Sequence, residues 1–126
     1  MQTWRQFKEN IEQNGLDNLI NQLKQKYPTE DLFAFENNYM IHISSIKIKP
    51  DSRSQGFGSE IIREIQKYAE KVGKPVVLVP SPEPRKKDAL LRFYKNLGFR
   101  KNSGRYMDYK LSTPFGITWV WKPNRN

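Results

Sequence analysis

The sequence predicts an α/β fold, and three observations predict it. Apolar residues alternate along Tyr39–Lys49, as in a strand that is buried on one face. They recur at helical spacing along Gly58–Val72 and again along Lys86–Leu97. Between these two segments stands the short run Val76–Val79, which is typical of a central strand covered on both faces. Strands that alternate with helices in this way characterise the α/β class.

The length and composition set bounds on the class of protein. The 126 residues suffice for a single domain, 1–126, with one packed core. The chain has no cysteine and one histidine, His42, which excludes disulfides, thiolate zinc sites and cysteine nucleophiles, and we expect no metal site. The amino terminus lacks the apolar stretch of a secretory signal, and no segment is apolar enough for a membrane span. We therefore expect a cytoplasmic protein without a membrane partner.

Two short amphipathic helices are predicted at the amino terminus, separated by Gly15. Pro28 ends this region, Leu32–Glu36 has the composition of a strand, and Asn37-Asn38 is a turn into the next strand. The apolar residues at helical spacing on the two sides of Gly15 are Trp4, Phe7, Ile11, Leu16, Leu19, Ile20 and Leu23.

The strand after the turn changes its apolar phase part-way along. Ile41 and Ile43 occupy odd positions, whereas Ile46 and Ile48 occupy even positions. Because side chains alternate with a period of two, one inserted residue is needed to bring all four to the same face. The sequence therefore predicts a β-bulge at Ser44-Ser45. The alternatives are a strand buried on both faces and a strand that ends and restarts.

Glycine and proline residues mark the ends of the later helices and strands. Gly73 caps the first long helix, and the prolines that follow Val79 stop further strand pairing. Gly98 ends the second long helix. Beyond it the sequence predicts a brief strand over Phe99–Lys101, a loop as far as Phe115 and a terminal strand over Ile117–Trp121.

A glycine-containing junction joins the bulged strand to the first long helix. Gly56 and Gly58 allow the backbone to approach a ligand closely, and the helix start offers unpaired amides with a partial positive charge. A pyrophosphate fits such a place, although a tight turn before a helix also uses glycine without any ligand. The junction reads Pro50-Asp51-Ser52-Arg53-Ser54-Gln55-Gly56-Phe57-Gly58-Ser59.

In its full context this junction resembles the acyl-coenzyme A signature of the Gcn5-related N-acetyltransferase (GNAT) family. The signature is an apolar-x-apolar-x-Pro strand followed by Arg/Gln-x-x-Gly-x-Gly/Ala, here Ile46-x-Ile48-x-Pro50 and Arg53-x-x-Gly56-x-Gly58. Downstream, Leu91-Arg92-Phe93-Tyr94-Lys95-Asn96-Leu97-Gly98-Phe99 resembles the family's Leu-Tyr-x-x-x-Gly-Phe segment. The resemblance covers about residues 40–101, and the layout is similar to that of short phage-borne members, which would act in the host cytoplasm.

The resemblance implies a GNAT-like mixed, mostly antiparallel sheet with a splayed central pair of parallel strands, flanked by helices and trimmed at the amino terminus. It implies acetyl-coenzyme A as co-substrate, with the Ile46 amide as oxyanion-hole donor and Lys86 or Lys87 near the adenosine phosphates. Many relatives have an asparagine where Lys87 stands. The implied coenzyme-binding residues are Ile46, Lys47, Ile48, Arg53, Ser54, Gln55, Gly56, Phe57, Gly58, Ser59, Lys87 and Tyr94.

The implied reaction is acetyl transfer to a primary amine, on a protein lysine or a small molecule, by direct attack. An alkyl amine with a pKa near ~10 is almost fully protonated at neutral pH, so a base is required. His42, with an ordinary pKa near ~6.5, is the first candidate and Glu36 at the hairpin is the second. Tyr94 matches the family's general acid, and a core tyrosine is the alternative.

The net charge of +9 favours an anionic partner. Eight basic residues and one acid, Asp88, lie from Arg85 to Arg105, and they form either a solvated helix face or a phosphate-binding surface. We expect an acceptor on an acidic or nucleic-acid-associated protein, and a monomer or homodimer. Two other function classes stay open: a basic nucleic-acid-binding module, and a protein that binds acetyl-coenzyme A without catalysis.

Overall fold

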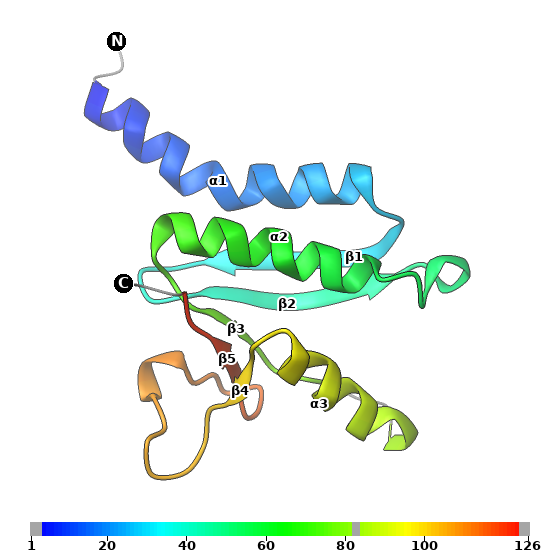
Figure 1. Cartoon of the computed structure of the whole chain (residues 1–126). Coiled ribbons are helices and arrows are strands. Elements are labelled where there is room, and N and C mark those ends of the chain that lie inside the picture. Colours follow the sequence, from blue (N-terminus) through cyan, green and yellow to red (C-terminus); the bar gives the residue numbers. More distant parts are fainter. Residues whose placement is uncertain (1–3, 82–83, 124–126) are drawn as a thin grey trace.

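The described part of the chain forms one five-stranded sheet with three α-helices (Figure 1). This computed structural model describes residues 4–81 and 84–123, and of residues 4–14 it describes the helical backbone alone. The strands lie in the order β1-β2-β3-β5-β4, and among them β2 and β3 alone run parallel. The elements are α1 (Trp4–Lys26), β1 (Thr29–Glu36), β2 (Ile41–Ile48), α2 (Phe57–Val72), β3 (Val76–Leu78), α3 (Lys87–Asn96), β4 (Arg100–Lys101) and β5 (Trp119–Trp121), with the 3₁₀ turns η1 (Pro50–Ser52), η2 (Pro84–Lys86) and η3 (Tyr109–Leu111).

This arrangement confirms the predicted mixed, mostly antiparallel sheet with a central parallel pair. Most of the predicted boundaries lie within two residues of those in the structure; β1 begins three residues before the expected Leu32. The loop predicted before Phe115 contains one short turn, η3. No helix in the described part of the chain is long and apolar enough to cross a lipid bilayer.

The sheet carries a large core on one face and a small core on the other. Val76 and Leu78 of β3 belong to the large core, which also contains buried residues of α1, α2 and α3. Figure 1 shows α1 and α2 beside β1 and β2, and α3 at the β4 end of the sheet. The small core lies on the opposite face, because neighbouring strand residues point to opposite sides. Its members are Met40, Val77, Leu111 and Val120.

A single helix, α1, occupies the region where two helices were expected, so that prediction is wrong. A glycine inside a helix costs only about 1 kcal/mol relative to alanine, and the burial of Leu16 and Ile20 beyond it favours a continuous helix. A Cβ atom at Gly15 would stand 2.9 Å from the Tyr68 hydroxyl of α2. Gly15 is therefore a position of close helix packing. The side chains of Trp4, Phe7 and Ile11 lie outside the described residues.

The predicted bulge is present in β2. In the ladder with β1, Ser45 pairs with Phe33 and the next pair joins Ile43 to Ala34, so Ser44 has no partner. The extra residue lets the two isoleucines after the bulge pack against the same core as the two before it. The structure thus confirms the prediction that a bulge brings all four isoleucines to the same face of the sheet.

The parallel strands β2 and β3 separate after three paired residues. Their ladder runs from Ile41 and Val76 to Ile43 and Leu78, and it stops there. β3 ends at that point and Pro80, which has no backbone N–H, follows shortly after. β2 continues beyond the bulge to the glycine-containing junction. The pair is therefore splayed, as predicted, and the split faces the start of α2.

Candidate functional site

A cavity of about 510 Å³ lies between α3 and the start of α2, and we call it the α2–α3 cavity. Nine of its lining residues belong to the predicted coenzyme set: Ile46, Lys47, Ile48, Arg53, Ser54, Gly56, Phe57, Gly58 and Ser59. The others are Ser52, Ser81, Lys86, Leu90 and Phe93. The predicted residues Gln55, Lys87 and Tyr94 do not line it.

The amino end of α2 presents backbone N–H groups at this cavity. Gly56 precedes the helix in the left-handed conformation (φ 82°), and its carbonyl accepts the first helical hydrogen bond, from Glu60 at 3.1 Å. The N–H groups of residues 57–59 consequently have no acceptor within α2. Ser54, two residues before Gly56, is also left-handed (φ 66°). A helix start with free amides and a partial positive charge favours an anion.

Among the described residues, three cationic side chains line the α2–α3 cavity: Lys47, Arg53 and Lys86. The Arg53 Nε donates a hydrogen bond to the Ile48 carbonyl at 3.0 Å, which orients the guanidinium. The Glu30 carboxylate lies 3.6 Å from Arg53 and 3.8 Å from Lys47. Exposed pairs of this kind contribute up to about 1 kcal/mol, so an anionic ligand can compete for both cations.

Beyond the bulge, backbone N–H groups of β2 point toward the split. The Ile41 N–H donates to the carbonyl that precedes β3, whereas the Lys49 N–H donates to the carbonyl that precedes β1, both at 2.9 Å. N–H directions alternate along a strand, so those of Ile46 and Ile48, after the bulge, point to the β3 side. No β3 residue is paired there, because the ladder has already ended.

A second cavity, of about 440 Å³, opens at the split itself, and we call it the split cavity. Ser81 lines both cavities, which therefore adjoin. His42 pairs with Val77 in the ladder, so its side chain lies on the sheet face opposite α2. The lining residues of the split cavity are His42, Ile43, Ser44, Val79, Pro80, Ser81 and Phe115.

His42 is buried, at 5% exposure, with one ring nitrogen unpartnered. Its Nδ1 lies 3.2 Å from the Ser44 hydroxyl, and its ring stacks on Phe35 with a centroid separation of 4.9 Å. Within the described residues its Nε2 has no hydrogen-bond partner. Burial lowers the pKa of His42 below its ordinary value of 6.5. The ring is therefore neutral at neutral pH and can accept a proton.

Tyr94 lies in the core beside the α2–α3 cavity. Its ring packs edge-on against Phe93, which lines that cavity, and against Phe99, with centroid separations of 5.3 and 5.8 Å. Burial raises the pKa of the Tyr94 hydroxyl, which therefore stays protonated and able to donate at neutral pH.

Glu36 and Lys87 do not line either of these two cavities. The Glu36 carboxylate accepts hydrogen bonds from the Tyr68 hydroxyl at 2.7 Å and from the Lys74 ammonium at 2.6 Å. These contacts tie the β1–β2 hairpin to the end of α2. Burial and the Glu36 carboxylate raise the pKa of Tyr68. Of the two lysines considered for the adenosine phosphates, the structure brings Lys86 to the α2–α3 cavity.

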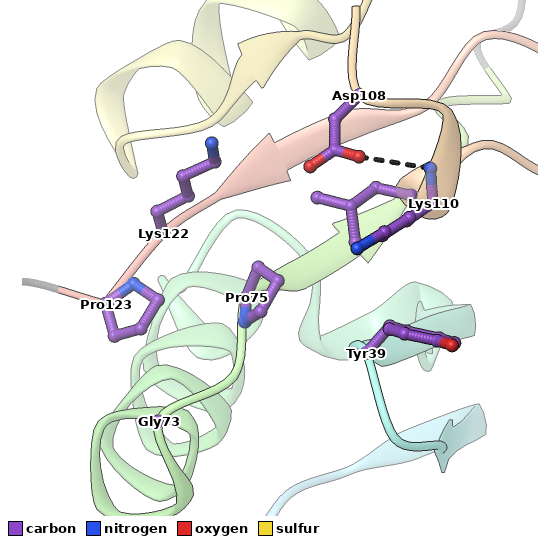
Figure 2. Close-up of a pocket in the computed structure, with 8 residues that line it drawn as sticks. Tyr39, Gly73, Pro75, Asp108, Lys110, Lys122 and Pro123 are labelled. Carbon is purple, nitrogen blue, oxygen red and sulfur yellow. Dashed lines mark hydrogen bonds between the residues drawn. The ribbon is translucent and has the colours of Figure 1, made fainter.

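A further cavity, of about 500 Å³, lies at the other end of β3 beside Pro75 (Figure 2). The Asp108 carboxylate accepts a hydrogen bond from the Lys110 backbone N–H at 3.0 Å, and the Lys110 ammonium lies 5.8 Å from the centre of the Tyr39 ring. This cavity contains none of the predicted site residues. It is separate from the site at the split.

Several lining residues, among them Leu90, Phe93, Ser81 and Phe115, were not predicted as site residues. Leu90 was predicted on the apolar face of the second long helix and Phe93 within the tyrosine segment, and both line the α2–α3 cavity. Ser81 and Phe115 lie in irregular segments, where no periodic pattern identifies a site. The described residues hold no group of three histidine, aspartate or glutamate side chains placed to bind a metal ion.

A profile of the family described as FR47-like protein matches residues 25–107, more than half of the chain. The chain belongs to the FR47-like family. This family is related to the Gcn5-related N-acetyltransferases, so the resemblance carried by the two motifs is confirmed. Membership places the FR47-like protein among enzymes that transfer acyl groups. Comparison with curated protein sequences finds no significant match.

Solved structures show the same fold. The anti-CRISPR protein AcrVA5 superposes with a TM-score of 0.55 at 20% identity, covering 72% of this chain and 87% of that one. PH1933 from Pyrococcus horikoshii OT3 gives 0.54 at 13% identity, covering 89% and 78%. Chaetomium thermophilum Naa20, in complex with a bisubstrate analogue, gives 0.47 at 17% identity, covering 74% and 56%. The first two likenesses show the fold alone.

The α2–α3 cavity of this FR47-like protein fits the chemistry of an acyl-coenzyme A. Free helix amides and three cations suit a diphosphate at one end. Apolar side chains such as Phe57, Leu90 and Phe93 suit the pantetheine arm. The cavity adjoins the split cavity through Ser81, on the side of β2 where the ladder with β3 has ended.

Proposed function

We propose that the protein transfers an acetyl group from acetyl-coenzyme A to a primary amine. One observation carries the proposal: the α2–α3 cavity and the split cavity meet where β2 and β3 part. A coenzyme held at the start of α2 has a route along β2 into the split. An acceptor has a second entrance on the opposite face, beside His42.

The residues proposed to hold the coenzyme match its charge at one end and its extended shape at the other. The backbone at residues 54–59, together with Arg53 and Lys86, holds the diphosphate, and the backbone of Ile46 and Ile48 holds the pantetheine arm. Lys47 adds positive charge at the rim. Acetyl-coenzyme A, when bound, supplies the acetyl group as a thioester. The Ile46 N–H donates to the thioester oxygen and stabilises negative charge on it.

His42 is the proposed general base. His42 lines the split cavity, its buried Nε2 has no hydrogen-bond partner among the described residues, and its lowered pKa keeps the ring neutral and ready to take a proton from the amine. Glu36 is the weaker candidate, because its carboxylate is held by Tyr68 and Lys74. In the transfer a C–N bond forms, the C–S bond breaks, His42 takes the amine proton, and the departing sulfur takes a proton from Tyr94, the proposed general acid.

The test has two stages. Thermal unfolding with and without acetyl-coenzyme A measures binding, because a ligand held by the folded state raises its stability by about 2.7 kcal/mol at a hundred times its Kd. Release of free thiol with a panel of amines and lysine peptides then measures turnover. We expect both a rise in Tm and amine-dependent thiol release.

The other outcomes identify the alternatives. A thermal shift without turnover for any amine would indicate a binding protein that lacks catalysis. No shift with the coenzyme, together with salt-sensitive binding to oligonucleotides, would refute the proposal and favour a nucleic-acid-binding module.

A further inference from the structure

We propose that the acceptor lysine is presented on an acidic polypeptide segment, which lies in a cavity lined by residues of α3, β4 and β5. This inference rests on the proposed function, because it names the class of acceptor for the same site. The cavity has a volume of about 810 Å³, and we call it the basic cavity. Its charged lining residues are Lys87, Lys95, Arg100 and Lys101, and no carboxylate side chain in the described part of the chain lines it.

The four cations of the basic cavity are available to a partner. All four side chains are exposed, and in the described residues none forms an ion pair with a carboxylate. The Arg100 guanidinium donates to the backbone carbonyls of Lys95 and Phe99, at 3.3 and 2.8 Å. These bonds fix its position without neutralising its charge. A concentration of positive charge without internal partners attracts an anionic ligand.

The remaining lining of the basic cavity is largely apolar, which favours a polypeptide over a small anion. Leu91 and Trp119 line the cavity, and Phe115 and Ile117 stand at its edge with exposed fractions of 79% and 54%. Large exposed apolar side chains beside charged ones are typical of a protein-binding surface. A peptide offers both carboxylates and apolar side chains. A nucleic acid lacks the alkyl amine that the reaction requires.

The basic cavity leads to the proposed reaction centre. It shares Val79, Pro80 and Phe115 with the split cavity, so the two adjoin along this segment. His42 lies in the lining of the split cavity. A peptide bound to the four cations can therefore extend its lysine past Phe115 toward His42. We expect acidic residues within a few positions of the modified lysine, because an extended chain spans only about 3.3–3.6 Å per residue.

The experiment compares three lysine peptides of one length, in which the flanking residues are acidic, neutral or basic. Thiol release gives kcat/KM, and fluorescence anisotropy of labelled peptides measures binding independently of catalysis. The test variant is Lys95→Glu with Lys101→Glu. The matched control is Arg63→Glu with Lys71→Glu, which makes the same charge change at two exposed positions of α2 outside the cavities described above.

We expect the acidic peptide to exceed the neutral one at least tenfold in kcat/KM, with an advantage that falls as salt rises. The test variant should lose this advantage and the control should keep it, while the thermal shift with acetyl-coenzyme A stays the same in both. Equal rates for the three peptides, or an advantage that survives in the test variant, would overturn the proposal.

Two further outcomes are informative. If the test variant loses its thermal shift with acetyl-coenzyme A, the basic cavity belongs to the coenzyme site and the acceptor proposal is wrong. If oligonucleotides bind to the basic cavity and the acidic peptide does not, the partner is a nucleic acid. Failure of the proposed function can be distinguished from failure of the acceptor proposal. If the proposed function is wrong, the unmodified protein shows no thermal shift with acetyl-coenzyme A. Fluorescence anisotropy would still show whether the basic cavity binds the acidic peptide.

Discussion

Replacing Gly58 by glutamate should raise the stability of the free protein and abolish coenzyme binding. Gly58 is the second residue of α2, with ordinary helical backbone, and a Cβ atom there would stand 3.7 Å from its nearest neighbour, the Phe93 ring. A side chain therefore fits. Exchanging glycine for a better helix former contributes about 0.5–1 kcal/mol, and a carboxylate in the first turn adds about 0.3–1 kcal/mol.

The same carboxylate would stand where the coenzyme diphosphate is proposed to bind. We expect the Tm of the free protein to rise by several degrees, since about 1 kcal/mol shifts the Tm of a domain of this size by roughly 3–6 °C. The gain of about 2.7 kcal/mol from a hundredfold excess of ligand over Kd should disappear. The control Gly58→Ala keeps the helix gain without the charge, and it should retain the ligand shift.

Differential scanning fluorimetry with and without acetyl-coenzyme A measures both effects in one experiment. If Gly58→Glu kept the ligand shift of the unmodified protein, the start of α2 would not hold the diphosphate. If both Gly58 variants lowered the Tm of the free protein, the helical assignment of this position would be at fault. The two results refute different steps of the reasoning.

Four other predictions concern Tyr94, His42 and the bulge at Ser44. Tyr94→Phe should lower kcat at least tenfold while the thermal shift with acetyl-coenzyme A changes little, and unchanged turnover would remove Tyr94 from the mechanism. The rate should fall as pH drops through the lowered pKa of His42, because the protonated ring cannot act as base. If a His42→Gln variant showed the same fall in rate at low pH, His42 would not be the general base. Stability should also fall below about pH 6.5, since the unfolded chain binds a proton that the buried ring resists, and urea titration at pH 5 and 7.5 measures the difference. Deleting Ser44 should destabilise the fold by several kcal/mol, because Ile46 and Ile48 would then turn to the opposite face; circular dichroism during urea unfolding tests this.

The parts of the fold that could be predicted depend on local patterns. The bulge at Ser44 follows from a phase change within one strand, and the end of α2 follows from Gly73, which is left-handed as a helix cap. The resemblance to the GNAT family implied the parallel split, and the bulge together with the prolines after β3 marked its position. Each of these signals acts over a few residues and is therefore visible in the chain itself.

The parts that could not be predicted depend on contacts distant in the sequence. Gly15 signalled a break, but its role is to let Tyr68 of α2 approach α1. The rotation of α3 about its axis decides that Lys86 lines the α2–α3 cavity and that Lys87 lines the basic cavity. The sequence alone does not show which of two adjacent lysines at a helix start faces which cavity. Phe115 reaches the split from a long irregular loop whose path is set by tertiary packing.

The short ladder between β2 and β3 also affects how readily this part of the sheet opens locally. Three residue pairs join β2 to β3, whereas seven pairs join β1 to β2, so the β2–β3 seam has fewer backbone hydrogen bonds than the hairpin, and α2 contacts the strands on both sides of it. Amide protons along this seam should exchange with deuterium sooner than those of the β1–β2 hairpin. A ligand bound in the gap would form the hydrogen bonds that β3 does not form with β2. The stability of the sheet, and the resistance of the chain to proteases, should therefore increase with the concentration of that ligand.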